Sequence, residues 1–137
     1  MKYSIFPIAC LCMLVAPALT AQTNPVALEL GKPVQAELAA GQSNQYSIEV
    51  KAGQFVRVEV SQPESATVIR LSEPAKKDNL LELHWPGSSQ RTESLCWIAK
   101  VAGGYHIEFA PAAPIAAADK YEITLEELRS SIADDQK

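Results

Sequence analysis

Apolar and polar residues alternate along most of the chain from Val34 onward. A period of two predicts half-buried β-strands, because successive side chains of a strand point to opposite faces. The alternation is clearest in residues 41–60, GQSNQYSIEVKAGQFVRVEV, where Lys51–Gly53 turns the chain between two predicted strands. The apolar side of this pair is expected to join a core, and the polar side to face solvent. That polar side carries Ser47, Glu49, Lys51, Arg57 and Glu59.

The same pattern predicts about eight short strands, separated by turns that contain Gly and Pro. By residue number they are 34–38, 46–50, 56–60, 69–71, 81–85, 92–100, 105–109 and 121–125. The segment 92–100, TESLCWIAK, is apolar on both faces through its middle, which is typical of a central strand. A helix is expected only near Leu125–Asp134, if anywhere. The predicted fold is therefore all-β: an antiparallel β-sandwich, jelly-roll-like, that follows an N-terminal signal peptide.

The first residues have the three-part pattern of a secretory signal peptide. Lys2 is followed by an apolar run over 5–15 and then by small residues. This run is too short to span a bilayer comfortably. We place the cleavage site after Ala21, with Ala18 as the alternative.

Removal of a signal peptide over residues 1–21 would leave a β-sandwich domain over 22–129 and a polar C-terminal tail over 130–137. We expect no membrane span in this mature chain and a periplasmic or secreted location. The loss of Lys2 changes the net charge from −4 to −5. An acidic chain of this kind has no electrostatic attraction for nucleic acid, so nucleic acid is not an expected partner.

Cleavage would also leave a single cysteine. Cys10 and Cys12 lie within the signal, and neither follows the small-residue motif of a lipidated cysteine. Cys96 is then alone, so no internal disulfide can form. Within an apolar strand, such a thiol is expected to be a small buried hydrophobic group. A nucleophile and an intermolecular bridge are the alternatives.

The sequence contains none of the common catalytic motifs. It lacks a Gly-x-Ser-x-Gly elbow, a His-Glu-x-x-His pair, a phosphate-binding loop and paired Cys-x-x-Cys motifs. We therefore expect no catalytic residue, no metal ion and no cofactor. A hydrolase remains the disfavoured alternative, for which His84, His106 and Cys96 would be the candidates.

Two short patterns place a carboxylate and an imidazole on the polar side of a predicted strand: Glu82-x-His84 and His106-x-Glu108. If these strands were neighbours, four ligands could converge on a metal ion, because side chains at i and i+2 share a face. Two ordinary solvated faces are the expected outcome. With Trp85, these four residues form the candidate binding set.

Trp85 has the inward parity of its strand but stands at the mouth of the loop PGSSQ. An aromatic ring in this place could be a stacking platform for a sugar or a peptide. It could also close the end of the core, and this second role is the one we expect.

Several stretches resemble a known family. Residues 28–60, LELGKPVQAELAAGQSNQYSIEVKAGQFVRVEV, resemble the opening of the bacterial pre-peptidase C-terminal (PPC) type of β-sandwich. The shared features are a Gly-containing turn, a Tyr-centred strand, an AGQ turn and a Val-rich strand. AGGYHIEF (102–109) and DKYEITLEELR (119–129) resemble its later and closing strands. The resemblance covers Val26–Arg129 and implies the fold.

The variety that is most similar precedes tetratricopeptide repeats and caspase-like CHAT domains in large bacterial proteins. This chain stops eight residues after Arg129, so the effector function of those longer proteins is not carried over. Relatives attached to secreted proteases sometimes bind calcium or the substrate of the protease. No acidic cluster in this sequence matches such a calcium site.

The sequence therefore predicts an exported, non-catalytic β-sandwich module. It is expected to bind a protein or carbohydrate partner through its loops or through a free sheet edge, because edge strands offer unpaired backbone groups. The alternatives are a structural or assembly domain shortened from a larger protein and, less favoured, a metal-binding or hydrolytic domain.

Overall fold

The computed structural model describes residues 24–61, 65–76, 78–87, 92–114 and 118–136. The predicted signal peptide lies outside the described residues. Nine strands and a short 3₁₀ helix make up the described chain. They are β1 Val26–Ala27, β2 Val34–Leu38, β3 Asn44–Val50, β4 Gln54–Ser61, β5 Thr67–Ser72, β6 Asn79–Trp85, β7 Thr92–Ile98, β8 Gly103–Pro111, β9 Asp119–Ser130 and η1 Ala133–Gln136.

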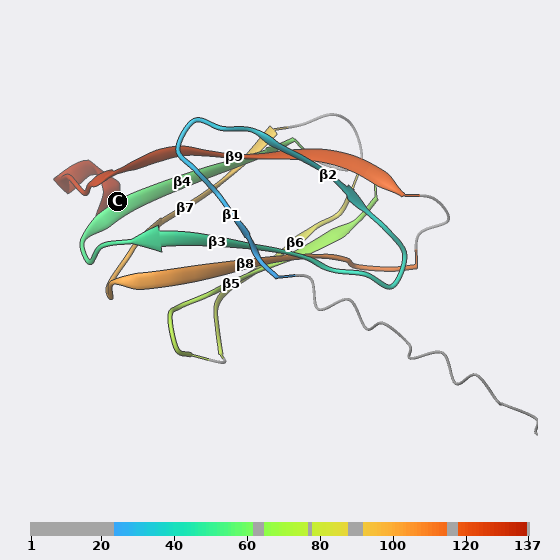
Figure 1. Ribbon diagram of the computed structural model, residues 1–137, viewed down its shortest axis with the longest axis horizontal. Helices are drawn as coiled ribbons and strands as arrows, with labels where there is room; N and C mark the ends of the chain where they lie inside the picture. Colours follow the sequence, from blue (N-terminus) through green and yellow to red (C-terminus); the bar gives the residue numbers. More distant parts are fainter. Residues whose placement is uncertain (1–23, 62–64, 77, 88–91, 115–117, 137) are drawn as a thin grey trace, which may run out of the picture.

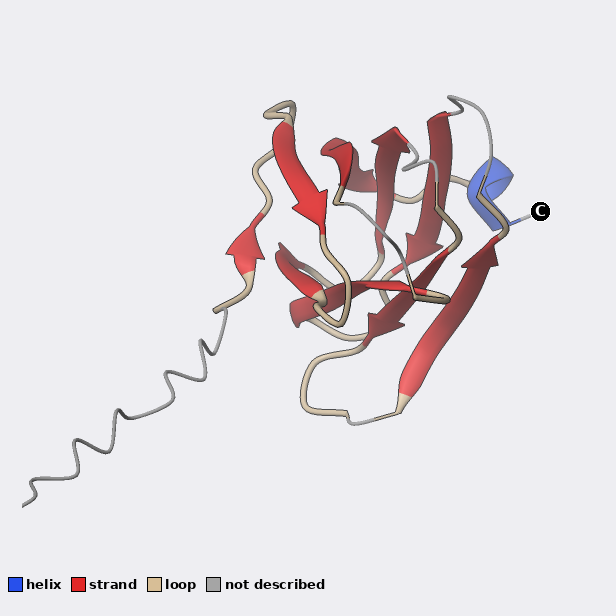
Figure 2. Ribbon diagram, turned by 90° about the vertical axis from the view of Figure 1, so that its right-hand side faces the viewer, coloured by secondary structure: helices blue, strands red, loops and turns tan. Residues whose placement is uncertain are grey.

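The strands form two sheets that pack face to face, with β9, β4 and β2 above β3, β8 and β5 in Figure 1. Sheet A has the strand order β1-β3-β8-β5-β6, and sheet B has the order β2-β9-β4-β7. The expectation that residues 41–60 form one pair of strands is wrong, because β3 and β4 lie in different sheets and their polar residues divide between the two outer faces. All strand pairs are antiparallel except the two-residue pairing of β1 with β3. The predicted all-β sandwich is confirmed, and the one helical turn lies at the C-terminal end (Figure 2). No helix among the described residues is long and apolar enough to cross a membrane.

The prediction of a central strand at 92–100 is wrong. Strand β7 pairs with β4 and forms an edge of sheet B. Its inward residues Leu95 and Trp97 are buried, whereas Cys96 points outward and is exposed. The expectation of a buried thiol is therefore wrong as well. Both errors have one cause. The outward residues of β7 carry no charge, and an edge strand with an uncharged outer face has the same sequence pattern as a central strand that is buried on both faces.

The prediction of a helix near Leu125–Asp134 is also wrong. Strand β9 continues through Ser130, and the only helical turn among the described residues follows at Ala133–Gln136. The spacing of Leu125 and Leu128 fits one face of a helix. A β-bulge between them also places two residues that are three positions apart on the same face of a strand. The register of β4 on β9 shifts between Arg57 and Val58, so that Leu125, which is buried, and Leu128, which is partly buried, both face the core.

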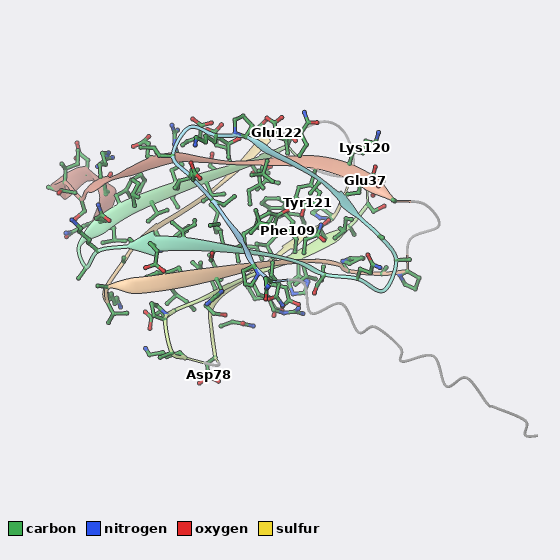
Figure 3. All side chains as sticks on the ribbon, viewed as in Figure 1. Glu37, Asp78, Phe109, Lys120, Tyr121 and Glu122 are labelled. Carbon is green, nitrogen blue, oxygen red and sulfur yellow. The ribbon has the colours of Figure 1, made fainter. Side chains whose placement is uncertain are left out.

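Aromatic rings from both sheets fill the centre of the sandwich. The ring of Tyr121 in β9 stacks on Phe109 in β8 with centroids 5.1 Å apart (both labelled in Figure 3). Tyr46 in β3 meets both rings edge-on, at 6.1 and 6.5 Å. The hydroxyl groups of Tyr46 and Tyr121 share a buried hydrogen bond of 2.5 Å. Burial raises the pKa of both phenols above the ordinary value of 10.0, so both stay neutral.

Asn44 extends this contact to strand β2. Its side-chain amide donates to the Tyr121 hydroxyl oxygen and to the backbone carbonyl of Glu37, both at 2.8 Å. Strands β2, β3 and β9 are thereby connected at one end of the sandwich, and both buried hydroxyl groups have hydrogen-bond partners.

The substitution Tyr121→Phe is expected to lower the free energy of unfolding by about 1–3 kcal/mol. It leaves the buried hydroxyl of Tyr46 and the side-chain amide of Asn44 without the hydrogen-bond partner that they share. Tyr46→Phe removes only one of these bonds and is expected to cost about 1 kcal/mol. Urea unfolding followed by tryptophan fluorescence measures both. Equal stability of Tyr121→Phe and the wild type would contradict the role assigned to the hydroxyl pair.

Candidate functional site: the outer face of sheet A

The four candidate charged residues lie on one face of one sheet. Glu82 and His84 are on β6, and His106 and Glu108 are on β8. Strand β5 runs between β6 and β8 and separates the two pairs. All four side chains alternate with inward apolar residues, so they point away from sheet B.

The residue that joins them is Arg70, which sequence reasoning missed. In the register of the sheet, Arg70 lies directly opposite Glu82 on one side and Glu108 on the other. Its guanidinium contacts Glu82 through Nε at 2.9 Å and Glu108 through a terminal nitrogen at 3.4 Å. Glu82 also contacts His84 Nε2 at 2.8 Å. We call Arg70, Glu82, His84 and Glu108 the Arg70 cluster.

The electrostatics of the Arg70 cluster are those of a carboxylate pair held by a cation. Hydrogen bonds from Arg70, and then from His84, lower the pKa of Glu82 below its ordinary value of 4.5. The hydrogen bond with Glu82 likewise raises the pKa of Arg70. Within the described residues, no group of three or more His, Cys, Asp or Glu side chains could hold a metal ion. Arg70 occupies the position between the carboxylates in which the four-ligand arrangement would have placed the metal.

His106 lies on the same face but apart from this cluster. It is opposite Ser47 of β3 and Ser72 of β5, and it is exposed. No hydrogen bond or ion pair joins His106 to the described members of the Arg70 cluster. The face thus presents a fixed charged group across β6, β5 and β8, and β8 also carries the imidazole of His106, which has no hydrogen bond or ion pair with a described residue.

Trp85 lies on the other side of β6 from Glu82 and His84. Its ring meets Phe109 edge-on at 6.2 Å, and the side chain is partly buried against the core. The rest of the loop that follows, residues 88–91, lies outside the described residues. Trp85 therefore borders the outer face of sheet A without belonging to it.

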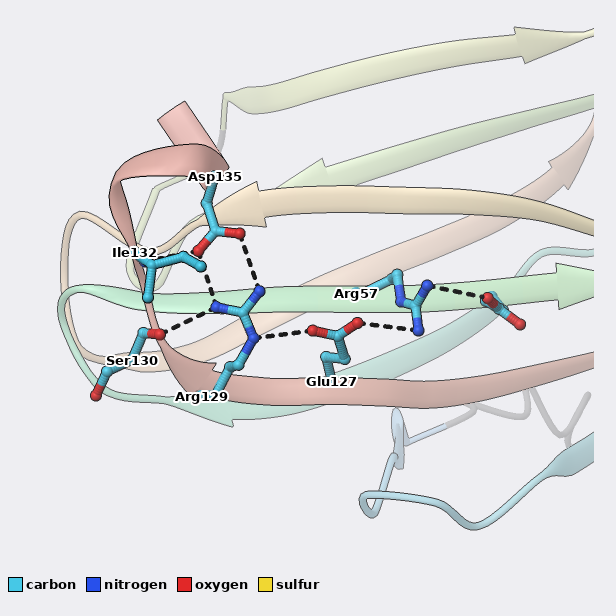
Figure 4. A network of polar contacts seen from close by, with 7 residues as sticks. Arg57, Glu127, Arg129, Ser130, Ile132 and Asp135 are labelled. Atoms are coloured by element: carbon cyan, nitrogen blue, oxygen red, sulfur yellow. Dashed lines mark hydrogen bonds and ion pairs between the residues drawn. The ribbon is translucent and has the colours of Figure 1, made fainter. Parts of the chain in front are cut away.

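A second polar network covers the outer face of sheet B (Figure 4). Glu127 accepts from Arg57 and from Arg129, each at 2.9 Å. Arg129 also forms a two-bond fork with Asp135, at 2.8 and 2.9 Å, and lies 4.6 Å above the ring centre of Phe55. This fork holds the C-terminal 3₁₀ turn against the end of the sheet and lowers the pKa of Asp135.

Cys96 stands beside this network, directly opposite Arg57. Although the side chain is exposed, desolvation by its neighbours, the largest effect, raises the pKa of the thiol above the ordinary value of 9.0, while Arg57 acts in the opposite direction. At neutral pH the group is therefore a thiol rather than a thiolate. A nucleophile needs the reverse shift.

Two pockets open on the surface of the described chain. One, of about 460 Å³, lies over β2, β9 and β4, where Figure 3 labels Glu37, Lys120 and Glu122. The other, of about 500 Å³, lies between the turn at 40–43 and the segment 110–114. The first is lined by side chains of both charges and the second by uncharged residues, most of them small. Neither pocket contains a predicted site residue.

Comparison with solved structures identifies the architecture. The pre-peptidase C-terminal domain of a collagenase from Bacillus anthracis superposes with a TM-score of 0.58 at 13% identity, over 75% of this chain and 95% of that domain. The chain has a PPC-like fold. PliG from Aeromonas hydrophila, a periplasmic inhibitor of g-type lysozyme, superposes with a TM-score of 0.53 at 12% identity, over 74% of this chain and 96% of PliG. No protein-family model matches the chain, and no curated protein matches it in sequence.

At these identities the likeness concerns the fold alone. It supports the PPC-like sandwich that the motifs in 28–60, 102–109 and 119–129 predict. It gives no support to the tetratricopeptide-repeat and CHAT context. The likeness therefore assigns no role to the candidate residues of this chain.

The substitution Glu82→Gln is expected to lower the urea midpoint at neutral pH, because it removes the charged partner of Arg70. The folded-state pKa of Glu82 is depressed, so its contribution is present above the ordinary value of 4.5 and is lost as pH falls through the folded pKa. The difference between the wild type and the variant should therefore shrink as the solution is acidified below that value. Urea titrations over a pH series measure it.

Glu49→Gln is the matched control, since Glu49 is an exposed carboxylate on the same sheet without an ion pair to any described residue. Its midpoint is expected to stay close to that of the wild type at neutral pH. A Glu82→Gln difference that persists at low pH would contradict the ion-pair assignment.

Proposed function

We propose that this protein is a non-catalytic binding module whose partner is another protein, and that it binds through the outer face of sheet A. The proposed contact residues are Glu82, His84, His106 and Glu108, with Trp85 at the border of the face. One observation carries the proposal: the Arg70 cluster presents ordered, charged side chains on the open face of a rigid sheet.

The order of this face favours recognition. Arg70 fixes both carboxylates, and Glu82 in turn fixes the imidazole of His84, whose side chain is 67% exposed. Side chains that are already held in place lose little conformational entropy when a partner binds. The face therefore combines accessibility with a defined geometry, which is what specific binding of a charged surface requires.

The charge of the face indicates the kind of partner. Within the strands of sheet A, the outward carboxylates of Glu49, Glu82 and Glu108 stand against one guanidinium, that of Arg70, and the mature chain that we propose is acidic overall. A partner with a basic surface would be complementary. PliG, which shares the fold, is an inhibitor of another protein, a g-type lysozyme. This precedent supports a protein partner rather than a small molecule.

We also propose that the protein is exported to the periplasm or secreted. The support is the signal-peptide pattern of residues 1–21 together with the periplasmic description of PliG. The mature chain would begin at Gln22, with the binding module over 22–129 and the short tail after it.

The substitution His106→Glu is expected to weaken partner binding by roughly tenfold, because it adds a like charge at the centre of an acidic face that meets a basic surface. Affinity capture from a periplasmic or culture extract, followed by titration of the captured protein, measures this. A g-type lysozyme is assayed in parallel as a defined candidate, with inhibition of its activity as the readout.

Ser94→Glu is the matched control, since it adds the same charge at an exposed position on sheet B. Equal binding by His106→Glu and the wild type would show that the partner uses another surface. If neither the wild type nor Ser94→Glu captures a partner, and the g-type lysozyme is not inhibited, the binding function itself is contradicted.

A further inference from the structure

Strand β6 is a sheet edge whose apolar side is left partly uncovered. In the described chain it pairs only with β5. Its inward residues Leu81, Leu83 and Trp85 are each only partly buried against the core. At the corresponding edge of sheet B, Leu95 and Trp97 are 3% and 9% exposed.

The two edges also differ in how they resist pairing. Strand β7 turns a charged residue, Glu93, to the same side as Leu95 and Trp97, which is a common protection of an edge against further strands. Strand β6 has apolar residues at all three inward positions from Leu81 to Trp85. Of these two edges, β6 is therefore the one that is open to another strand.

The backbone groups that β6 offers can be deduced from the hydrogen bonds of its neighbour. The Ala112 N–H donates to the Ala66 carbonyl at 2.9 Å, and these two residues are opposite each other in the extended register of β5 and β8. Hydrogen-bonding direction alternates along an antiparallel strand, so Ile69 bonds toward β6 and its partner there is Leu83. The N–H and C=O groups of Glu82 and His84 then point to the free edge.

These groups are self-complementary about a two-fold axis at Leu83. In an antiparallel pair of β6 strands centred there, Glu82 of one copy lies opposite His84 of the other, twice, as hydrogen-bonded pairs with opposite charge when His84 is protonated. Leu83 meets its own copy, and Leu81 meets Trp85. Centring the axis on Glu82 would instead oppose two carboxylates, and centring it on His84 would oppose two imidazoles.

We propose that a second copy of this chain pairs with β6 in this antiparallel register, so that the two five-stranded sheets become one continuous sheet. Because the axis is perpendicular to the sheet, both outer faces lie on the same side. The inference rests on the proposed function: pairing duplicates the binding face and gives bivalent attachment to a partner that repeats.

The length of the contact makes this dimer reversible. The register of β6 on β5 shifts between Leu71 and Ser72, so Leu81 is the first residue of β6 in the regular ladder. At the other end of β6, Pro86 follows Trp85 and has no N–H to donate. Five residues from each copy form the new ladder, with Leu81, Leu83 and Trp85 on its inner side. The association is expected to depend on protein concentration.

Sedimentation equilibrium of the purified protein tests the pairing. His84→Pro deletes an N–H that points to the free edge and leaves every hydrogen bond between β5 and β6 in place. By symmetry the dimer loses two bonds, so its dissociation constant is expected to rise by roughly tenfold or more. His84→Glu provides a variant with an unchanged backbone; it opposes two pairs of carboxylates and is expected to weaken the dimer likewise.

Ser94→Pro is the matched control on the other edge. The Ala99 N–H donates to the Gln54 carbonyl at 2.9 Å, so the Ser94 N–H, by the same alternation, points away from β4. This variant is expected to dimerise like the wild type. His106→Glu, which changes the face but not the edge, is also expected to dimerise like the wild type.

The outcomes separate this inference from the proposed function. A wild-type protein that stays monomeric up to about 1 mM would overturn the pairing, as would a dimer that both His84 variants leave intact. If the protein is monomeric yet still binds a partner that His106→Glu weakens, the proposed function stands and the pairing falls. If no partner is bound while the dimer forms, the reverse holds.

Discussion

The sandwich depends on the contact of Tyr121 with Phe109, which is the point where a ring of sheet B stacks on a ring of sheet A. The hydrogen bond between the Tyr46 and Tyr121 hydroxyls fixes the same two sheets at a polar point within an apolar core. A directional bond between buried groups specifies one alignment, whereas hydrophobic burial alone tolerates several. Phe109 follows Glu108 in β8, so this alignment also places the outer face of sheet A.

The strands were predictable because one face of each is buried. Wherever polar residues alternate with core residues, as in β3, β4 and β8, the period of two is unambiguous. The pattern fails where two structures share it. Leu125 and Leu128 fit a helix as well as a bulged strand, and the uncharged row of β7 fits a central strand as well as an edge.

The candidate site was predictable only in part. The alternation in β6 and β8 shows that Glu82, His84, His106 and Glu108 face outward, and the structure brings them to one sheet. The sequence does not give the order of strands in a sheet or their register, because both arise from contacts between distant segments. Arg70 could be recognised as an outward residue of its strand, but its place between two carboxylates follows from the register alone.

The bulge in β9 decides on which side the end of the chain is polar. It adds one residue to β9 opposite Arg57 and Val58, and it thereby turns Leu128 inward and Arg129 outward. Without the bulge, the alternation of a regular strand would exchange the two sides of the last part of β9. The guanidinium of Arg129, which now contacts Asp135, would then point between the sheets, and Leu128 would point into water. The extra residue therefore lets this sequence keep its leucine in the core and its guanidinium in water, and deletion of one of the two glutamates at the bulge would leave both sides as they are.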